Sequence, residues 1–189
     1  RASGRATRDF AREKQVLDKA RSIAAGLGVP TGLAEALFSL LIQSSLANQE
    51  QARVRAEGQG SGKPVLVIGG SGKMGRWFAE FLHSQGFDVT VADPAGPHAG
   101  FRHVFDWRDT PDQFAITVVS APIDCMAEIL EELGARKRSG LIFDIGSLKS
   151  PFIDKLKALA GGGSRVTSIH PMFGPDTELL SGRHVLFLD

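Results

Sequence analysis

Apolar residues recur at helical spacing near the start of the chain. One stripe consists of Val16, Leu17, Ala20, Ile23, Ala24 and Leu27. Asp9 is a candidate N-cap for a helix over 10–27, and Gly26, Gly28 and Pro30 are expected to end it.

A second helix is predicted from Thr31, its candidate cap, to about residue 55. Its inward residues are expected to be Leu33, Ala36, Leu37, Leu40 and Leu41. At the same i+4 spacing, Leu37 and Leu41 are followed by the polar residues Ser45 and Gln49. This change indicates either a face emerging into solvent, which periodicity alone favours, or a polar pocket facing Arg12 and Glu13. Because two helices cannot cover their apolar faces, a further helix or a second subunit is expected.

The pattern changes after a glycine-rich stretch at 58–64, which is predicted to be a flexible linker between a helical segment, 1–57, and a second domain, 65–189. There, short apolar runs alternate with helical patterns. Predicted strands are 65–68, 87–92, 101–105, 114–120, 141–145 and 165–169, and predicted helices include 123–133, opened by Pro122, and 149–160. This alternation is typical of an α/β fold with a Rossmann-type, doubly wound parallel sheet.

Composition excludes several classes of function. The 22 basic and 21 acidic residues nearly cancel, so charge does not favour nucleic acid or an anionic membrane as a partner. No apolar run is long enough to span a bilayer, and no signal peptide is visible. The single cysteine cannot form an internal disulfide, which favours the cytoplasm. We expect no metal site.

The first predicted strand of the second domain enters a glycine-rich turn. Gly70, Gly72 and Gly75 have the G-x-G-x-x-G spacing, and Ser71, Lys73 and Met74 complete it. Gly70 would permit the tight turn, Gly72 would let a pyrophosphate approach the backbone, and Gly75 would let the next helix pack closely. That helix would direct free N–H groups and its positive dipole end at the phosphates. The alternative is a strand–turn–helix without a ligand.

Polar residues also follow the other predicted strands. Asp93 could accept hydrogen bonds from ribose hydroxyls and would repel a 2′-phosphate, which favours NAD over NADP. Ser120, Ser147 and His170 come at later strand ends, where ligands of such sheets bind. The serines could instead cap helices, and by position alone His170 would be structural.

Four motifs together resemble the prephenate dehydrogenase family: those at 69–76, 118–123, 144–149 and 170–175. The resemblance implies oxidative decarboxylation of prephenate to 4-hydroxyphenylpyruvate, with hydride passing to NAD. It implies that His170 accepts a hydrogen bond from the ring hydroxyl, that Ser147 places this hydroxyl and the histidine, and that Ser120 lies by the nicotinamide. A neutral imidazole is needed, so activity should fall when it is protonated. Lys149 is expected to be structural.

The segments 8–13, 28–30 and 37–49 are similar to the second and third helices of the all-helical chorismate mutase family. That resemblance implies a mutase site in which Arg12 and Ser45 bind substrate carboxylates and hydroxyl, Glu13 contacts the hydroxyl and Gln49 the ether oxygen, with Asp9 nearby. The rearrangement of chorismate needs only a compact conformer and donors at the ether oxygen. The family's first helix and the lysine before Arg1 are missing, so an incomplete site is expected.

The order of the two segments resembles the bifunctional chorismate mutase–prephenate dehydrogenase (T-protein) family. This implies a homodimer, with tyrosine as a candidate feedback inhibitor. The chain begins with Arg1 and ends after an apolar run, so we expect a fragment at both ends. It should bind NAD but turn over little prephenate, because the family's carboxylate-binding arginine follows the nucleotide domain. The alternatives are an arogenate dehydrogenase, and a non-catalytic NAD-binding or regulatory module with a helical dimerisation arm.

Overall fold

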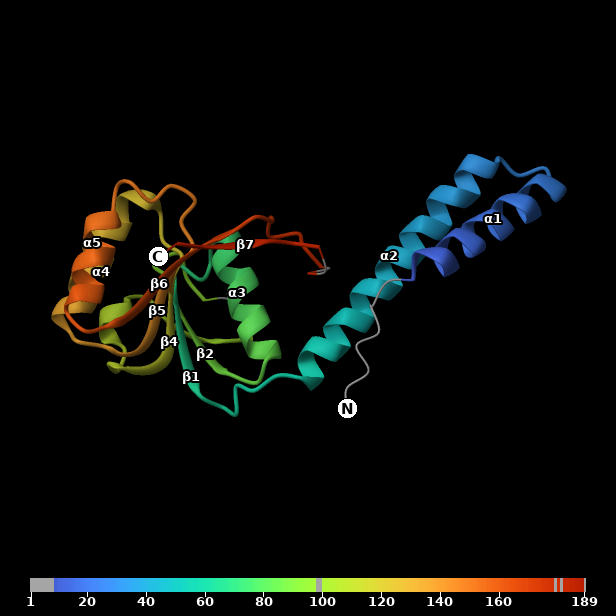
Figure 1. Ribbon diagram of the computed structural model, residues 1–189. Helices are drawn as coiled ribbons and strands as arrows, with labels where there is room; N and C mark the ends of the chain where they lie inside the picture. Colours follow the sequence, from blue (N-terminus) through green and yellow to red (C-terminus); the bar gives the residue numbers. More distant parts are fainter. Residues whose placement is uncertain (1–8, 98–99, 179, 181, 189) are drawn as a thin grey trace, which may run out of the picture. The chain divides into compact units, whose positions relative to one another are not determined.

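The computed structural model describes residues 9–97, 100–178, 180 and 182–188. It divides into two compact units (Figure 1). The first contains the described residues up to Val54, together with Glu178 and Leu180; the second contains Arg55–Thr177 and resumes at Gly182. Residues 1–8 of the predicted helical segment lie outside the described residues.

The first unit is a helical hairpin of α1 (Phe10–Gly26) and α2 (Thr31–Ala56), of which only the last two residues fall in the second unit. The Asp9 carboxylate caps α1 by accepting from the Arg12 N–H at 3.0 Å, as predicted. Thr31 is the first residue of α2 rather than its cap, because the Pro30 carbonyl already accepts from the Ala34 N–H at 3.3 Å.

The buried apolar side chains of the hairpin are small, so the prediction of the inward residues of α2 is wrong. Leu33, Ala36, Leu37, Leu40 and Leu41 are all exposed, whereas Ala20, Ala24 and Ala47 are buried. The guanidinium of Arg21 bonds the Glu35 carboxylate between the two helices. Two helices share one narrow line of contact, which small residues fill, so the larger apolar side chains remain uncovered.

Part of the predicted linker is hydrogen-bonded to the second unit. The Gly60 and Gly62 N–H groups donate to the carbonyls of Gln85 (2.9 Å) and Gly86 (2.8 Å). A Cβ on Gly60 would lie 2.5 Å from the Gly86 carbonyl carbon, so close backbone packing explains this glycine. These bonds hold part of the predicted linker against the second unit, and Pro64 already belongs to the first strand. The flexible hinge stays a prediction.

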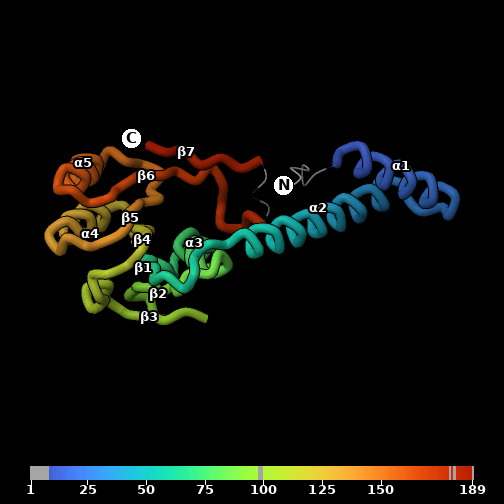
Figure 2. Tube along the Cα trace, turned by 60° about the horizontal axis from the view of Figure 1, so that its bottom comes forward, coloured from blue at the N-terminus to red at the C-terminus, as the bar shows by residue number. Residues whose placement is uncertain are grey.

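The second unit is built on a seven-stranded sheet in the order β3-β2-β1-β4-β5-β6-β7. The strands are β1 (Pro64–Ile68), β2 (Asp88–Ala92), β3 (Arg102–Val104), β4 (Gln113–Val119), β5 (Ser139–Asp144), β6 (Arg165–Pro171) and β7 (Val185–Leu188). The first six are parallel, as predicted, but β7 runs antiparallel to β6. Figure 2 shows β7 beside β6 at one edge and β3 at the other.

Helices cover both faces of this sheet. In Figure 1, α3 (Lys73–Ser84) lies on one face, and α4 (Ile123–Ala135) and α5 (Ile153–Gly161) lie on the other. Alternate β1 residues enter opposite layers: Val65 and Val67 join the core under α3, while Leu66 and Ile68 join the core under α4 and α5. The near-continuous apolar strands of the sequence follow from this double covering. No helix in the described part of the chain is long and apolar enough to cross a membrane.

Two connections position later elements. A 3-10 turn, η1 (Trp107–Asp109), precedes β4. Helix α5 begins at Ile153, four residues later than predicted, so Lys149 lies in a turn before it. Pro151 explains the delay, because proline disfavours the helical conformation of the residue before it.

Candidate active site

The residues predicted to bind the cofactor and to act on substrate lie along one edge of the sheet. The glycine turn follows β1, Asp93 follows β2, Ser120 follows β4 and Ser147 follows β5, while His170 is the penultimate residue of β6. These strands are adjacent and parallel in the order β2-β1-β4-β5-β6. Their carboxyl ends therefore form one continuous edge, where ligands of doubly wound sheets bind.

Each glycine of the turn is required for a different structural reason. Gly69, just before the predicted motif, makes the tight turn with a φ of 77°, which corrects the prediction for Gly70. Gly70 instead packs against Val91, whose Cγ1 would lie 2.7 Å from an added Cβ. At Gly75 a Cβ would lie 2.2 Å from the Gly69 carbonyl oxygen, so α3 can pack this closely only with glycine there.

The start of α3 fits the phosphates of a dinucleotide. Gly72 is exposed and is the N-cap residue, and no side chain caps the helix. The N–H groups of the first turn, from Lys73 and Met74 onward, have no intrahelical acceptor. They carry the positive end of the helix dipole, and the missing Cβ of Gly72 leaves their approach open.

Asp93 ties the glycine turn to the loop after β2. Its Oδ2 accepts from the Ser71 N–H at 3.0 Å and its Oδ1 from the Ala95 N–H at 2.8 Å. The Ser71 hydroxyl in turn donates to the Gly96 carbonyl at 3.0 Å. Each oxygen of an ionised carboxylate can accept a second hydrogen bond, so this buried group still fits a ribose hydroxyl.

The sequence predicts a strand that ends at residue 169, just before His170. In the structure His170 lies within β6. The ring is half-buried, and Nδ1 is enclosed without a hydrogen-bond partner among the described residues. Nε2 is therefore the nitrogen that a ligand at the edge can reach.

The two serines do not cap helices. The N-cap of α4 is Pro122 and that of α5 is Phe152, so the capping alternative for Ser120 and Ser147 is wrong. Ser120 is half-buried against the glycine turn, and its N–H donates to the Ile68 carbonyl at 2.9 Å. Ser147 is exposed in the loop after β5.

An aromatic contact that sequence reasoning missed holds the loop after His170. The Trp77 ring on α3 lies 4.9 Å from the Phe173 ring, measured between centroids. Its Nε1–H donates to the Thr177 carbonyl at 3.1 Å. The sequence shows Trp77 only as part of a helical pattern, and nothing in the spacing connects it with a loop so far along the chain.

Residues 78–188 match the family described as prephenate dehydrogenase, nucleotide-binding domain. The chain belongs to the prephenate dehydrogenase family. This match covers more than half of the 189 residues, and it starts within α3, just after the glycine turn. Prephenate dehydrogenases use NAD, which agrees with the open helix start and with Asp93.

Three curated relatives extend the comparison. The T-protein of Enterobacter agglomerans is 26% identical over 181 residues, 94% of this chain and 45% of its own length. The "Probable arogenate/prephenate dehydrogenase" of Methanocaldococcus jannaschii is 28% identical over 124 residues, 61% of this chain and 28% of its own. The 4-amino-4-deoxyprephenate dehydrogenase of Streptomyces pristinaespiralis is 33% identical over 131 residues, 64% and 44% respectively. The chain thus spans less than half the length of these relatives.

The predicted mutase residues lie on the hairpin, which the T-protein alignment largely includes. Arg12, Ser45 and Gln49 are exposed and Glu13 is half-buried. Gln49 Nε2 donates to Ser45 Oγ at 3.2 Å, so these two residues form a polar pair on α2. The Asp9 carboxylate is engaged in capping α1.

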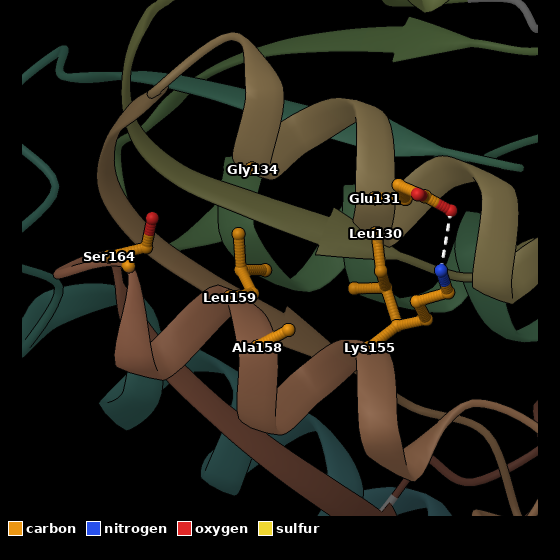
Figure 3. A pocket seen from close by; sticks show the side chains of 8 residues that line it. Leu130, Glu131, Gly134, Lys155, Ala158, Leu159 and Ser164 are labelled. Atoms are coloured by element: carbon orange, nitrogen blue, oxygen red, sulfur yellow. Dashed lines mark hydrogen bonds and ion pairs between the residues drawn. The ribbon is translucent and has the colours of Figure 1, made fainter.

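A hollow of about 240 Å³ lies between α4 and α5, away from the candidate site. Figure 3 shows it beside an ion pair in which Lys155 Nζ lies 2.6 Å from Glu131 Oε2. Its lining consists of Leu130, Glu131, Gly134, Lys155, Ala158, Leu159, Gly162 and Ser164. Ser164 directly precedes β6, so the hollow extends toward the amino ends of the strands, opposite the dinucleotide edge. Small residues at the helix crossing explain it.

Proposed function

We propose that the second unit catalyses the NAD-dependent oxidative decarboxylation of prephenate to 4-hydroxyphenylpyruvate, a step of tyrosine biosynthesis, in the cytoplasm. The observation that carries the proposal is the shared edge on which the glycine turn, Ser120, Ser147 and His170 meet adjacent strand ends. Membership of the prephenate dehydrogenase family supports the same reaction.

In this proposal the dinucleotide lies across the carboxyl ends of β1 and β2. The N–H groups at the start of α3 bind the pyrophosphate, in the turn formed by Gly70, Ser71, Gly72, Lys73, Met74 and Gly75. Asp93 accepts from the ribose hydroxyls, and its charge excludes a 2′-phosphate. Ser120 and Pro122, at the end of β4, border the nicotinamide.

His170 then acts as the proton acceptor, assisted by Ser147, which places the substrate hydroxyl. Bound NAD supplies the hydride acceptor. The carbon that bears the ring hydroxyl loses its hydrogen as hydride, while the hydroxyl proton moves to His170 Nε2 and a carbonyl forms. The ring carboxylate leaves as carbon dioxide, its bonding electrons complete the aromatic ring, and the imidazolium returns the proton to the phenolate oxygen. Because the imidazole must start neutral, acid slows the reaction.

The test compares prephenate with arogenate in the longest natural protein that contains this chain. We expect NADH formation with prephenate at a higher kcat/KM than with arogenate, and its loss in His170→Asn. Higher kcat/KM with arogenate would favour the second candidate, which the name of the Methanocaldococcus relative supports. Binding of NAD and tyrosine without turnover of either substrate would favour the regulatory module.

We further propose that the hairpin contributes to a chorismate mutase site built from Asp9, Arg12, Glu13, Ser45 and Gln49. The Ser45–Gln49 pair supports this, because it presents a donor and an acceptor on one helix face. We expect the wild type to convert chorismate to prephenate. If Gln49 donates to the ether oxygen, Gln49→Ala should lower the rate of this conversion at least about tenfold. Equal rates would contradict this assignment.

We also propose a homodimer through the hairpin, with tyrosine as a feedback inhibitor. Exposed large apolar side chains support the dimer: Phe10, Ile23, Leu27, Leu33, Leu37, Leu40 and Leu41 are each more than half exposed. A surface of this kind marks an interaction site. Tyrosine shares the phenol ring of the product, so inhibition competitive with prephenate is the expected result.

A further inference from the structure

Lys149 links the ends of two neighbouring strands beside His170. Its Nζ donates to Asp144 Oδ1 at 2.5 Å and to the Ile169 carbonyl at 2.9 Å. Asp144 is the last residue of β5, and Ile169 directly precedes the histidine in β6. The ammonium thus connects both strands at the edge where the candidate active site lies.

The bond to Ile169 acts directly on the backbone of His170. The Ile169 carbonyl and the His170 N–H belong to one planar peptide group. Fixing the carbonyl therefore restricts the orientation of this peptide plane, which includes the Cα that bears the imidazole side chain. The paired register of β5 and β6 ends at Asp144 and Ser168. Gly146 lies two residues beyond the end of β5, and its N–H turns back to Asp144 Oδ1 at 3.0 Å. Lys149 binds the backbone of β6 beyond the paired register.

Burial makes the pair obligatory. Asp144 is fully buried, and its Oδ2 has no hydrogen-bond partner among the described residues. An isolated buried carboxylate is costly, and Lys149 is the cation that compensates it. A buried ion pair nevertheless adds little net stability compared with apolar residues of similar size. Stability alone therefore does not explain why an ion pair occupies this buried position.

The same strand face carries further polar groups. Ser168 is paired with Asp144 across the two strands, and side chains alternate between the faces of a strand, so Asp144, Ser168 and His170 share one face. The buried Ser168 Oγ and His170 Nδ1 also lack partners among the described residues. On β5 and β6 the preceding residues of this face, Ile142 and Val166, are apolar, so the polar groups of these two strands gather at the carboxyl end, where the imidazole lies.

We infer that Asp144 and Lys149 are positioning residues that hold His170 for proton transfer. The inference rests on the proposed function, in which the imidazole accepts a proton from the substrate hydroxyl. Neither residue needs to touch the substrate. Lys149 sets the peptide plane before His170, and Asp144 holds the ammonium in place.

Kinetics of Lys149→Met, Lys149→Arg and the matched control Lys155→Met test the inference in the longest natural protein containing this chain. Lys155 also bridges a carboxylate, that of Glu131, but both side chains are exposed and the pair joins α5 to α4 rather than two strands. We expect Lys149→Met to lower kcat for prephenate by about 100-fold, as a displacement of about 1 Å can, with KM for NAD changed less than about twofold. Arginine should restore most of kcat, and Lys155→Met should match the wild type.

Asp144→Asn with Lys149→Met should lower kcat no further than Lys149→Met alone, because the two act as one unit. Unchanged kcat in Lys149→Met would overturn the inference, as would a loss in kcat that accompanies an equal loss of NAD affinity.

A second measurement separates this inference from the proposed function. In the 189-residue chain, the His170 imidazole NMR signals should move in Lys149→Met and stay in place in Lys155→Met. Signals that do not move would overturn the positioning role. A wild type that turns over neither prephenate nor arogenate would instead overturn the proposed function.

Discussion

Gly75 and Gly72 lie in the same turn, yet alanine at each should cause a different defect. Gly75→Ala would bring Cβ to 2.2 Å from the Gly69 oxygen and 2.8 Å from the Gly70 Cα. Both are backbone atoms, so no rotamer change relieves the clash. Overpacking costs about 1–3 kcal/mol and occasionally more, and we expect a loss near the upper value. For a chain of this size that lowers Tm by roughly 6–12 °C.

Gly72→Ala should spare the fold and weaken cofactor binding. Its Cβ would meet only the Gly69 oxygen, at 3.3 Å, and its φ of −66° suits any residue. Alanine is a poorer N-cap than glycine, which costs about 0.5–1 kcal/mol. The methyl group would stand before the N–H groups that we assign to the pyrophosphate. NAD affinity should therefore fall at least about tenfold, or about 1.4 kcal/mol.

Thermal unfolding without ligand and calorimetric titration with NAD measure the two effects separately. Gly161→Ala, at the end of α5, is the matched control because an added Cβ there meets nothing within 4 Å. It should leave both quantities close to wild type. Wild-type NAD affinity in Gly72→Ala would refute the assignment of the phosphate site, and an unchanged Tm in Gly75→Ala would refute the packing argument.

Three further changes test other parts of the molecule. His170→Asn should lower dehydrogenase kcat at least about 100-fold and remove the acid limb of the pH–rate profile while NAD still binds; a surviving limb would contradict its role. Arg138→Met should lower the free energy of unfolding, measured in urea, by about 2–3 kcal/mol, because the buried guanidinium donates to Thr110 Oγ1 at 2.9 Å. Burial also lowers the pKa of Arg138. A loss of stability below about 1 kcal/mol would show that other hydrogen bonds replace this one. Glutamate at both Leu37 and Leu41 should yield monomers in sedimentation velocity without changing the unfolding of the second unit, and a persistent dimer would place the interface elsewhere.

Local signals in the sequence determined most of the second unit. Near-continuous apolar runs, each followed by a helical period, predict strands buried on both faces, and the six parallel strands agree. The G-x-G-x-x-G spacing predicts the helix start, and the strand-end positions of Asp93, Ser120 and His170 place them on one edge. These inferences succeed because they depend on neighbouring residues and on a topology with few alternatives.

Only the tertiary structure decided which residues meet across long sequence separations. Periodicity identifies the apolar stripe of α2 but not whether another element covers it, and those leucines are exposed. The Trp77–Thr177 bond and the link from Lys149 to Ile169 depend on how loops return to the sheet, which no local spacing encodes. Gly69, rather than Gly70, takes the positive φ because the chain turns there beneath Ser120. Strand order brings such residues together, and the packing of whole elements sets that order.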